Sequence, residues 1–215
     1  MAPAVDYFSP PVCDDSAVVG FCVTDSFSYY QTSHGWANYL PDMVWQFYLQ
    51  GVLLYGAARD GAYLSAGHYS ELVRELQLRS GRAPAFVLII AMGNDLLRRP
   101  SYPCRVWDDY AHLRGVAGAL LQIPTIDADG ADVGLIFAGS TETFGYRDLD
   151  CYDDAALAVL DMLPYNMFYF IDRLRDLGSL RTADAIGHIH ERERWRVVRR
   201  LMSLAAELCA LQFGA

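Results

Sequence analysis

The chain has 215 residues, of which 53% are hydrophobic and 20% charged, and its formal net charge is −9. This length and composition are typical of one globular domain with a sizeable core, and they exclude a disordered chain. The acidic balance argues against a nucleic-acid partner, which requires a basic surface. All 17 basic side chains are arginine. Mechanisms that need a lysine, such as a Schiff base, a Walker-type phosphate lysine or a serine–lysine dyad, are therefore excluded.

The five cysteines are scattered and form no C-x-x-C pair, so neither a zinc site nor a disulfide framework is predicted. We expect no cofactor and no metal. A reducing, cytoplasmic location fits this cysteine usage. The N-terminal segment has no basic region followed by an apolar stretch, so no signal peptide is expected. No apolar run is long enough to predict a membrane span.

The first half of the chain alternates predicted strands and helices. A buried strand over 17–24 precedes a helix over 35–49, in which apolar residues recur at helical spacing and Pro41 lies near the start. A second strand over 52–57 is followed by an amphipathic helix over 69–78. This order of elements is typical of a parallel sheet.

The unbroken apolar run Phe86–Ile90 is the clearest strand in the sequence. It contains three β-branched residues and has glycine and proline on its flanks, as expected of a strand buried on both faces of a parallel sheet. This strand, predicted over 85–91, leads into Gly93-Asn94-Asp95. Ligands collect at the carboxyl ends of strands in open α/β sheets, so this segment is a candidate site as well as a candidate turn or helix cap.

The second half continues the alternation. The predicted elements are a helix over 110–121, a strand over 133–138, helices over 155–163 and 166–174, a loop over 180–190, and a closing helix over 191–211.

The domain organisation is simple. Residues 1–15 are rich in proline and acidic residues and are expected to form an N-terminal arm that lies loosely on the surface. The rest of the chain has no internal repeat and no linker, so residues 16–215 are expected to form a single domain. Strands alternating with helices predict a three-layer α/β/α sandwich with a mainly parallel, doubly wound sheet.

Residues suited to catalysis follow the predicted strands. Asp25-Ser26 follows the first strand, Gly61 the second and Asn94 the third, and Asp184 and His188 lie in the loop before the closing helix. In a doubly wound sheet these segments emerge at one edge. The sequence therefore places a hydroxyl, an amide and an Asp/His pair within reach of one another.

The order and spacing of these residues resemble the SGNH (GDSL-type) hydrolase family over about residues 16–212. Thr24-Asp25-Ser26 corresponds to the family's Gly-Asp-Ser block, and Gly61 to its second-block glycine. Gly93-Asn94-Asp95 corresponds to the Gly-x-Asn-Asp block, one residue shorter. Asp184 and His188 approximate the Asp-x-x-His block that precedes the last helix.

The resemblance implies a flavodoxin-like SGNH fold and a serine hydrolase that cleaves a small-molecule carboxylic ester or thioester through an acyl-enzyme intermediate. By this resemblance Ser26 is the nucleophile, His188 the general base and Asp184 the residue that orients the imidazole. The resemblance also implies an oxyanion hole formed by the backbone N–H groups of Ser26 and Gly61 and the side-chain amide of Asn94.

Two departures from the family pattern leave alternatives open. Thr24 replaces a glycine, and three residues rather than two separate Asp184 from His188. His190 is a second candidate base, because G-H-I-H resembles the common D-G-I-H. We favour His188, which keeps the apolar residues of the closing helix in the usual register.

Other functions are also open. The alternative to an enzyme is a non-catalytic SGNH-like binding or scaffold module. A metal site built from the H-x-H pair with Asp184 and Glu191 is a further hypothesis. An unrelated flavodoxin-like fold that binds a phosphorylated ligand ranks last, since the chain has neither a glycine-rich G-x-G-x-x-G stretch nor a lysine.

Overall fold

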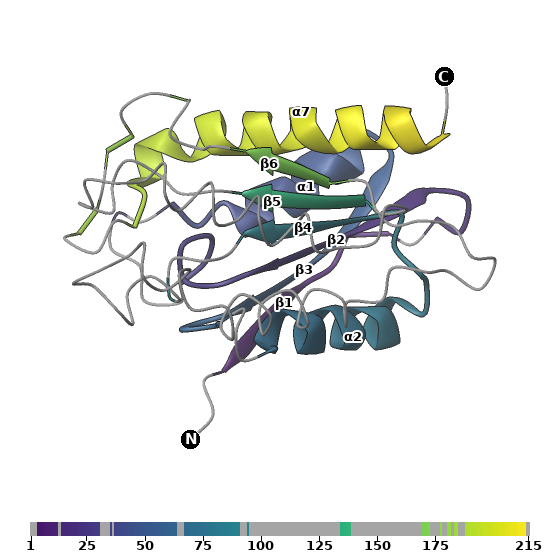
Figure 1. Cartoon of the computed structure of the whole chain (residues 1–215), viewed down its shortest axis with the longest axis horizontal. Helices are drawn as coiled ribbons and strands as arrows, with labels where there is room; N and C mark the ends of the chain where they lie inside the picture. The colour runs from purple at the N-terminus through teal and green to yellow at the C-terminus, as the bar shows by residue number, and fades with distance from the viewer. Residues whose placement is uncertain are drawn as a thin grey trace, which may run out of the picture.

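The fold is a three-layer arrangement in which helices cover both faces of one sheet (Figure 1). The computed structural model describes residues 4–12, 14–30, 35, 37–63, 67–90, 94, 134–138, 169–172, 177, 180–181, 183–184 and 188–213. The strands within these residues are β1 (Val5–Phe8), β2 (Val18–Thr24), β3 (Val52–Arg59), β4 (Phe86–Ile90), β5 (Gly134–Ala138) and β6 (Tyr169–Asp172). The helices are α1 (Leu40–Leu49), α2 (His68–Ser80), the short 3₁₀ helix η3 (Glu191–Glu193) and α7 (Arg194–Phe213).

The sheet has the order β1-β3-β2-β4-β5-β6 within the described part of the chain. All neighbouring pairs from β3 to β6 are parallel, and only β1 runs antiparallel, against β3. The predicted α/β/α sandwich with a mainly parallel sheet is therefore confirmed. Because β3, β2 and β4 are neighbours and run the same way, their carboxyl ends lie side by side at one edge.

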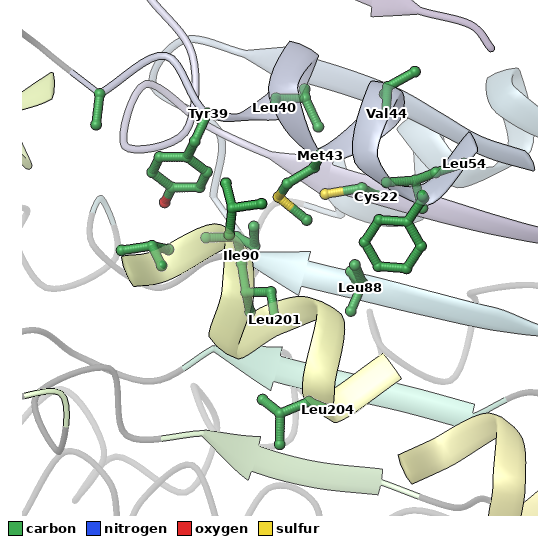
Figure 2. Close-up of a cluster of buried hydrophobic side chains, with 14 of the residues drawn as sticks. Cys22, Tyr39, Leu40, Met43, Val44, Leu54, Leu88, Ile90, Leu201 and Leu204 are labelled. Atoms are coloured by element: carbon green, nitrogen blue, oxygen red, sulfur yellow. The ribbon is translucent and has the colours of Figure 1, made fainter. Parts of the chain in front are cut away.

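Alternate residues of the central strands pack against different helices. Cys22, Leu54 and Leu88 lie in a buried cluster with side chains of α1 and α7, and Figure 2 shows these side chains meeting over the sheet. Helix α2 covers the other face with a stripe of buried apolar residues that includes Leu72 and Leu76. This division follows from the two-residue period of a strand, which sends successive side chains to opposite faces.

Several elements differ at their ends from the prediction. Helix α1 begins at Leu40, five residues later than expected, with Pro41 in its first turn, where a residue without an N–H is tolerated. Strand β3 continues to Arg59, because β1 pairs with its last four residues.

Part of the predicted N-terminal arm is a strand. Val5–Phe8 forms β1, and its backbone pairs with residues 56–59 of β3. The Arg79 guanidinium lies 3.6 Å from the centre of the Tyr7 ring, a cation–π contact that ties β1 to α2. The expectation of a loose arm was therefore wrong for these four residues.

The helix expected over 166–174 was also wrong in its centre. Tyr169–Asp172 forms strand β6 and pairs in parallel register with β5. Aromatic and β-branched residues favour extended backbone, and the free edge of β5 supplies the hydrogen bonds. The helices expected over 110–121 and 155–163 lie outside the described residues.

The close contact between Gly20 and Phe86 generates the first testable prediction. These residues are paired across β2 and β4, and a Cβ added to Gly20 would lie 2.2 Å from the tip of the Phe86 ring. Phe86 is fully buried, so its ring has no free volume to move into. We expect Gly20→Ala to lower the free energy of unfolding by about 1–3 kcal/mol through overpacking.

Urea denaturation measures this effect, with Phe86→Leu as the partner in a double-mutant cycle. Replacing the Phe86 ring by the shorter leucine side chain should recover part of the stability that Gly20→Ala loses. Purely additive effects of the two substitutions would contradict the contact as its cause.

Candidate active site

Ser26 lies in a tight turn that directly follows the central strand β2. The Ser28 N–H donates to the Asp25 carbonyl at 3.2 Å, which closes the turn around Ser26 and Phe27. The Asp25 carboxylate accepts a hydrogen bond from the Phe27 N–H at 2.9 Å, a local pattern that favours turns. Only 7% of Ser26 is exposed. The turn thus presents a mostly buried hydroxyl at the carboxyl edge of the sheet.

Thr24, which replaces the family's glycine, is accommodated by a buried hydrogen-bond network. Its hydroxyl donates to the Ile90 carbonyl of β4 at 3.2 Å and contacts the Ser28 hydroxyl. The Ser28 hydroxyl also lies 3.1 Å from the Tyr39 hydroxyl, and burial raises the pKa of that phenol. Thr24, Ser28 and Tyr39 are all fully buried. The network joins the Ser26 turn to β4 on one side and to the start of α1 on the other.

His188 brings its imidazole against Ser26. His188 Nε2 lies 3.1 Å from Ser26 Oγ, and His188 Nδ1 lies 2.5 Å from Asp184 Oδ2. Since a carboxylate can only accept, Nδ1 is the donor to Asp184, and Nε2 is the ring nitrogen that faces the hydroxyl. The Phe27 ring packs against the imidazole, with centroids 4.8 Å apart and planes inclined by 31°. These contacts restrain the ring in the orientation that faces Ser26.

The unusual spacing between Asp184 and His188 is explained by local backbone pairing. The Ala183 N–H donates to the His188 carbonyl at 2.8 Å, and the His190 N–H donates to the Arg181 carbonyl at 2.8 Å. These bonds bring Arg181 and Ala183 alongside His188 and His190. Asp184 Oδ1 also accepts the His188 backbone N–H at 3.1 Å. One carboxylate therefore holds both the backbone and the ring of His188 despite the extra residue.

His190, the second candidate base, has a different role in the structure. Its Nδ1 accepts a hydrogen bond from the Arg192 N–H at 3.2 Å and caps the 3₁₀ helix η3. Its Nε2 faces the Gly35 region, 3.7 Å from where a Cβ would lie on that glycine. His188 is thus the histidine that the structure brings to Ser26.

Gly61 and Asn94 lie after the two strands that flank β2. Gly61 lies in the turn after β3. This turn is closed by a hydrogen bond of 3.2 Å, which the Ala62 N–H donates to the Arg59 carbonyl. Its φ of +65° is in the left-handed region, which is the local reason for glycine here, and no described atom lies within 4 Å of where its Cβ would be. The Asn94 amide donates to Asp25 Oδ2 at 3.1 Å. Their roles as oxyanion donors remain predictions.

Sequence reasoning did not identify Tyr69 as part of this region. The sequence pattern placed Tyr69 only as the first residue of the predicted helix over 69–78. Tyr69 is 1% exposed, and its hydroxyl donates to Asp25 Oδ2 at 3.1 Å. The hydroxyl of a buried tyrosine usually requires a hydrogen-bond partner, and this rule was the only signal in the sequence that pointed to such a contact.

Within the described ranges, the structure contains neither a candidate metal centre nor a membrane-spanning helix. No three histidine, cysteine, aspartate or glutamate side chains there form a group that could hold a metal ion. None of the helices described is both long enough and apolar enough to cross a bilayer.

Comparison with known proteins shows a likeness in structure alone. No family model matches the chain, and no curated protein matches its sequence. The solved structures it resembles include TesA, with a TM-score of 0.54, 19% identity, and coverage of 88% of this chain and 99% of TesA. A second is the psychrotrophic esterase EstA from Pseudoalteromonas sp., inhibited by monoethylphosphonate, with a TM-score of 0.56, 17% identity and coverage of 88% and 96%.

A third similar structure is a catalytic mutant of Axe2, an acetylxylan esterase from Geobacillus stearothermophilus. Its TM-score is 0.54, its identity 14%, and the match covers 86% of this chain and 93% of Axe2. At these identities the likeness is one of fold. The chain shares the α/β/α fold of these solved structures, as its alternating strands and helices predict.

The Thr24 network generates a prediction about stability. Thr24→Val keeps the shape of the side chain but leaves the buried Ile90 carbonyl without this donor. We expect the free energy of unfolding to fall by about 1–3 kcal/mol. Thr24→Ser, which retains the hydroxyl, is the matched control and should lose less in chemical denaturation. Equal losses in the two variants would contradict a contribution from the hydroxyl.

Proposed function

We propose that the protein is a serine hydrolase that cleaves a carboxylic ester or thioester through an acyl-enzyme intermediate. The observation that carries the proposal is the chain of contacts from Ser26 Oγ to His188 Nε2 at 3.1 Å and from His188 Nδ1 to Asp184 at 2.5 Å. A nucleophile, a base and an orienting carboxylate in this order form the arrangement that activates a serine hydroxyl.

The proposed reaction begins when Ser26 Oγ attacks the carbonyl carbon of the ester. His188 Nε2 takes the serine proton as the new C–O bond forms, and it then protonates the leaving alcohol or thiol as the ester bond breaks. Asp184 stabilises the imidazolium that exists between these steps. Water, activated by the same histidine, then attacks the acyl group on Ser26 and releases a carboxylic acid.

The negative charge of the tetrahedral intermediate requires hydrogen-bond donors aimed at the former carbonyl oxygen. We assign these donors to the backbone N–H groups of Ser26 and Gly61 and to the Asn94 amide. The topology supports this assignment, because Gly61 follows β3 and Asn94 follows β4, on either side of the strand that carries Ser26. Asn94 has two amide protons, and only one is needed for its contact with Asp25.

The non-catalytic module is less well supported than the enzyme. Its motivation was Thr24 together with the stretched Asp184–His188 spacing. However, a carboxylate oxygen lies 2.5 Å from the His188 ring, and the ring lies within hydrogen-bond distance of Ser26. A binding protein needs no such alignment. The proposal of an esterase also fits the solved structures that share this fold, two of which are described as esterases.

Labelling with a fluorophosphonate tests the proposal directly, since this reagent reacts with activated serines. We expect the wild-type protein to be labelled, and Ser26→Ala and His188→Ala to lose the label because they lack the nucleophile and its base. His190→Ala is the matched control for His188→Ala, because it removes a histidine two residues further along the chain, and this variant should keep the label. Gel fluorescence after a timed reaction gives the rate.

Thermal unfolding of each variant separates lost reactivity from lost structure. A folded wild-type protein that takes no label, or a Ser26→Ala variant labelled at the wild-type rate, would contradict the proposed function. Loss of the label in His190→Ala rather than in His188→Ala would reassign the base.

A further inference from the structure

The Asp25 side chain has no role in the steps above, although it precedes the proposed nucleophile. Asp25 is fully buried. One carboxylate oxygen accepts the Phe27 N–H, and the other accepts both the Tyr69 hydroxyl and the Asn94 amide, each at 3.1 Å. A buried carboxylate is costly unless it is well hydrogen-bonded, so these donors stabilise Asp25 where it lies.

The contact with Asp25 sets the orientation of the Asn94 amide. An ionised carboxylate accepts only, so the Asn94 nitrogen rather than its oxygen must face Asp25. The two N–H bonds of an amide lie in one plane at a fixed angle. When one of them is held by Asp25, the direction of the other is determined.

Tyr69 reaches the same oxygen from a different element. It lies in the first turn of α2, which packs on β2 and β3, and its ring is 1% exposed. Its hydroxyl donates to the oxygen that receives the Asn94 amide, so it restrains the rotation of the carboxylate that holds Asn94. The rigid helix thereby fixes a residue that follows β4.

We infer that Tyr69 is a positioning residue for the oxyanion hole, acting through Asp25 to aim the free N–H of Asn94 at the reacting carbonyl oxygen. The inference rests on the proposed function, which makes Asn94 an oxyanion donor. It adds a residue from α2 to a site otherwise built from the strand ends and the loop before α7.

Tyr69→Phe tests the inference, because it removes only the hydroxyl and keeps the buried ring. With p-nitrophenyl acetate as the substrate, we expect kcat and kcat/KM to fall together by about tenfold, since the lost interaction acts only in the transition state. In an Asn94→Ala background the same substitution should have no further effect on kcat. An unchanged kcat in Tyr69→Phe, or a full additional loss in the Asn94→Ala background, overturns the inference.

Tyr39→Phe is the matched control. It also removes the hydroxyl of a fully buried tyrosine, but that hydroxyl hydrogen-bonds to Ser28. Any effect it has on kcat should be the same in the Asn94→Ala background as in the wild type. Coupling of Tyr39 to Asn94 as strong as that of Tyr69 would show a general loss of structure and would overturn the inference.

A second readout does not depend on activity. The side-chain amide resonances of Asn94, identified by their absence in Asn94→Ala, should shift in Tyr69→Phe and stay in place in Tyr39→Phe. If the wild type neither hydrolyses the ester nor takes the label, the proposed function fails. In that case the Asn94 resonances alone test whether Tyr69 positions Asn94. Resonances that do not move in Tyr69→Phe overturn the inference even if the enzyme is active.

Discussion

The site depends on one constraint, the attachment of the Ser26 turn to the end of a strand that is buried between two parallel neighbours. Strand β2 pairs along its length with β3 and ends in register with β4, so Thr24 and Ile90 are partners at the carboxyl edge. The turn has little freedom beyond this point. The Thr24 hydroxyl binds the Ile90 carbonyl, and the N–H of Tyr39, the residue before α1, donates to the Ser28 carbonyl at 3.0 Å. Ser26, the proposed nucleophile, is therefore positioned by the sheet itself.

His188, the proposed base, is positioned by separate backbone pairing. The segment 188–191 is held on one side by Arg181 and Ala183 and on the other by Gly35 and Ala37. On the second side the Ala37 N–H donates to the Ile189 carbonyl at 2.7 Å, and the Glu191 N–H donates to the Gly35 carbonyl at 2.8 Å. His188 is 3% exposed, while Ile189 beside it is buried in the core cluster with α1 and α7. Core packing on one side of this segment and the carboxylate of Asp184 on the other together fix the imidazole.

Much of the fold and of the candidate site could be predicted from local sequence patterns. The unbroken apolar runs predicted β2 and β4 closely, and the order of Ser26, Asp184 and His188 singled out side chains that do meet in the structure. Long-range pairing decided the rest. Tyr169–Asp172 has no clear hydrophobic periodicity of its own and forms a strand by pairing with β5. Val5–Phe8 likewise forms a strand by pairing with β3. The contact of Tyr69 with Asp25 spans 44 positions, so no local pattern could indicate it.

The most direct test of the account is a crystal structure of the protein after reaction with an ethylphosphonate reagent, which leaves a tetrahedral group resembling the intermediate. The account predicts a covalent bond from phosphorus to Ser26 Oγ. It also predicts a phosphonyl oxygen within about 2.7–3.1 Å of the Gly61 N–H and the Asn94 amide, the range expected of oxyanion donors. An unmodified Ser26 in treated crystals, or an adduct whose oxygen points away from both donors, would contradict the account.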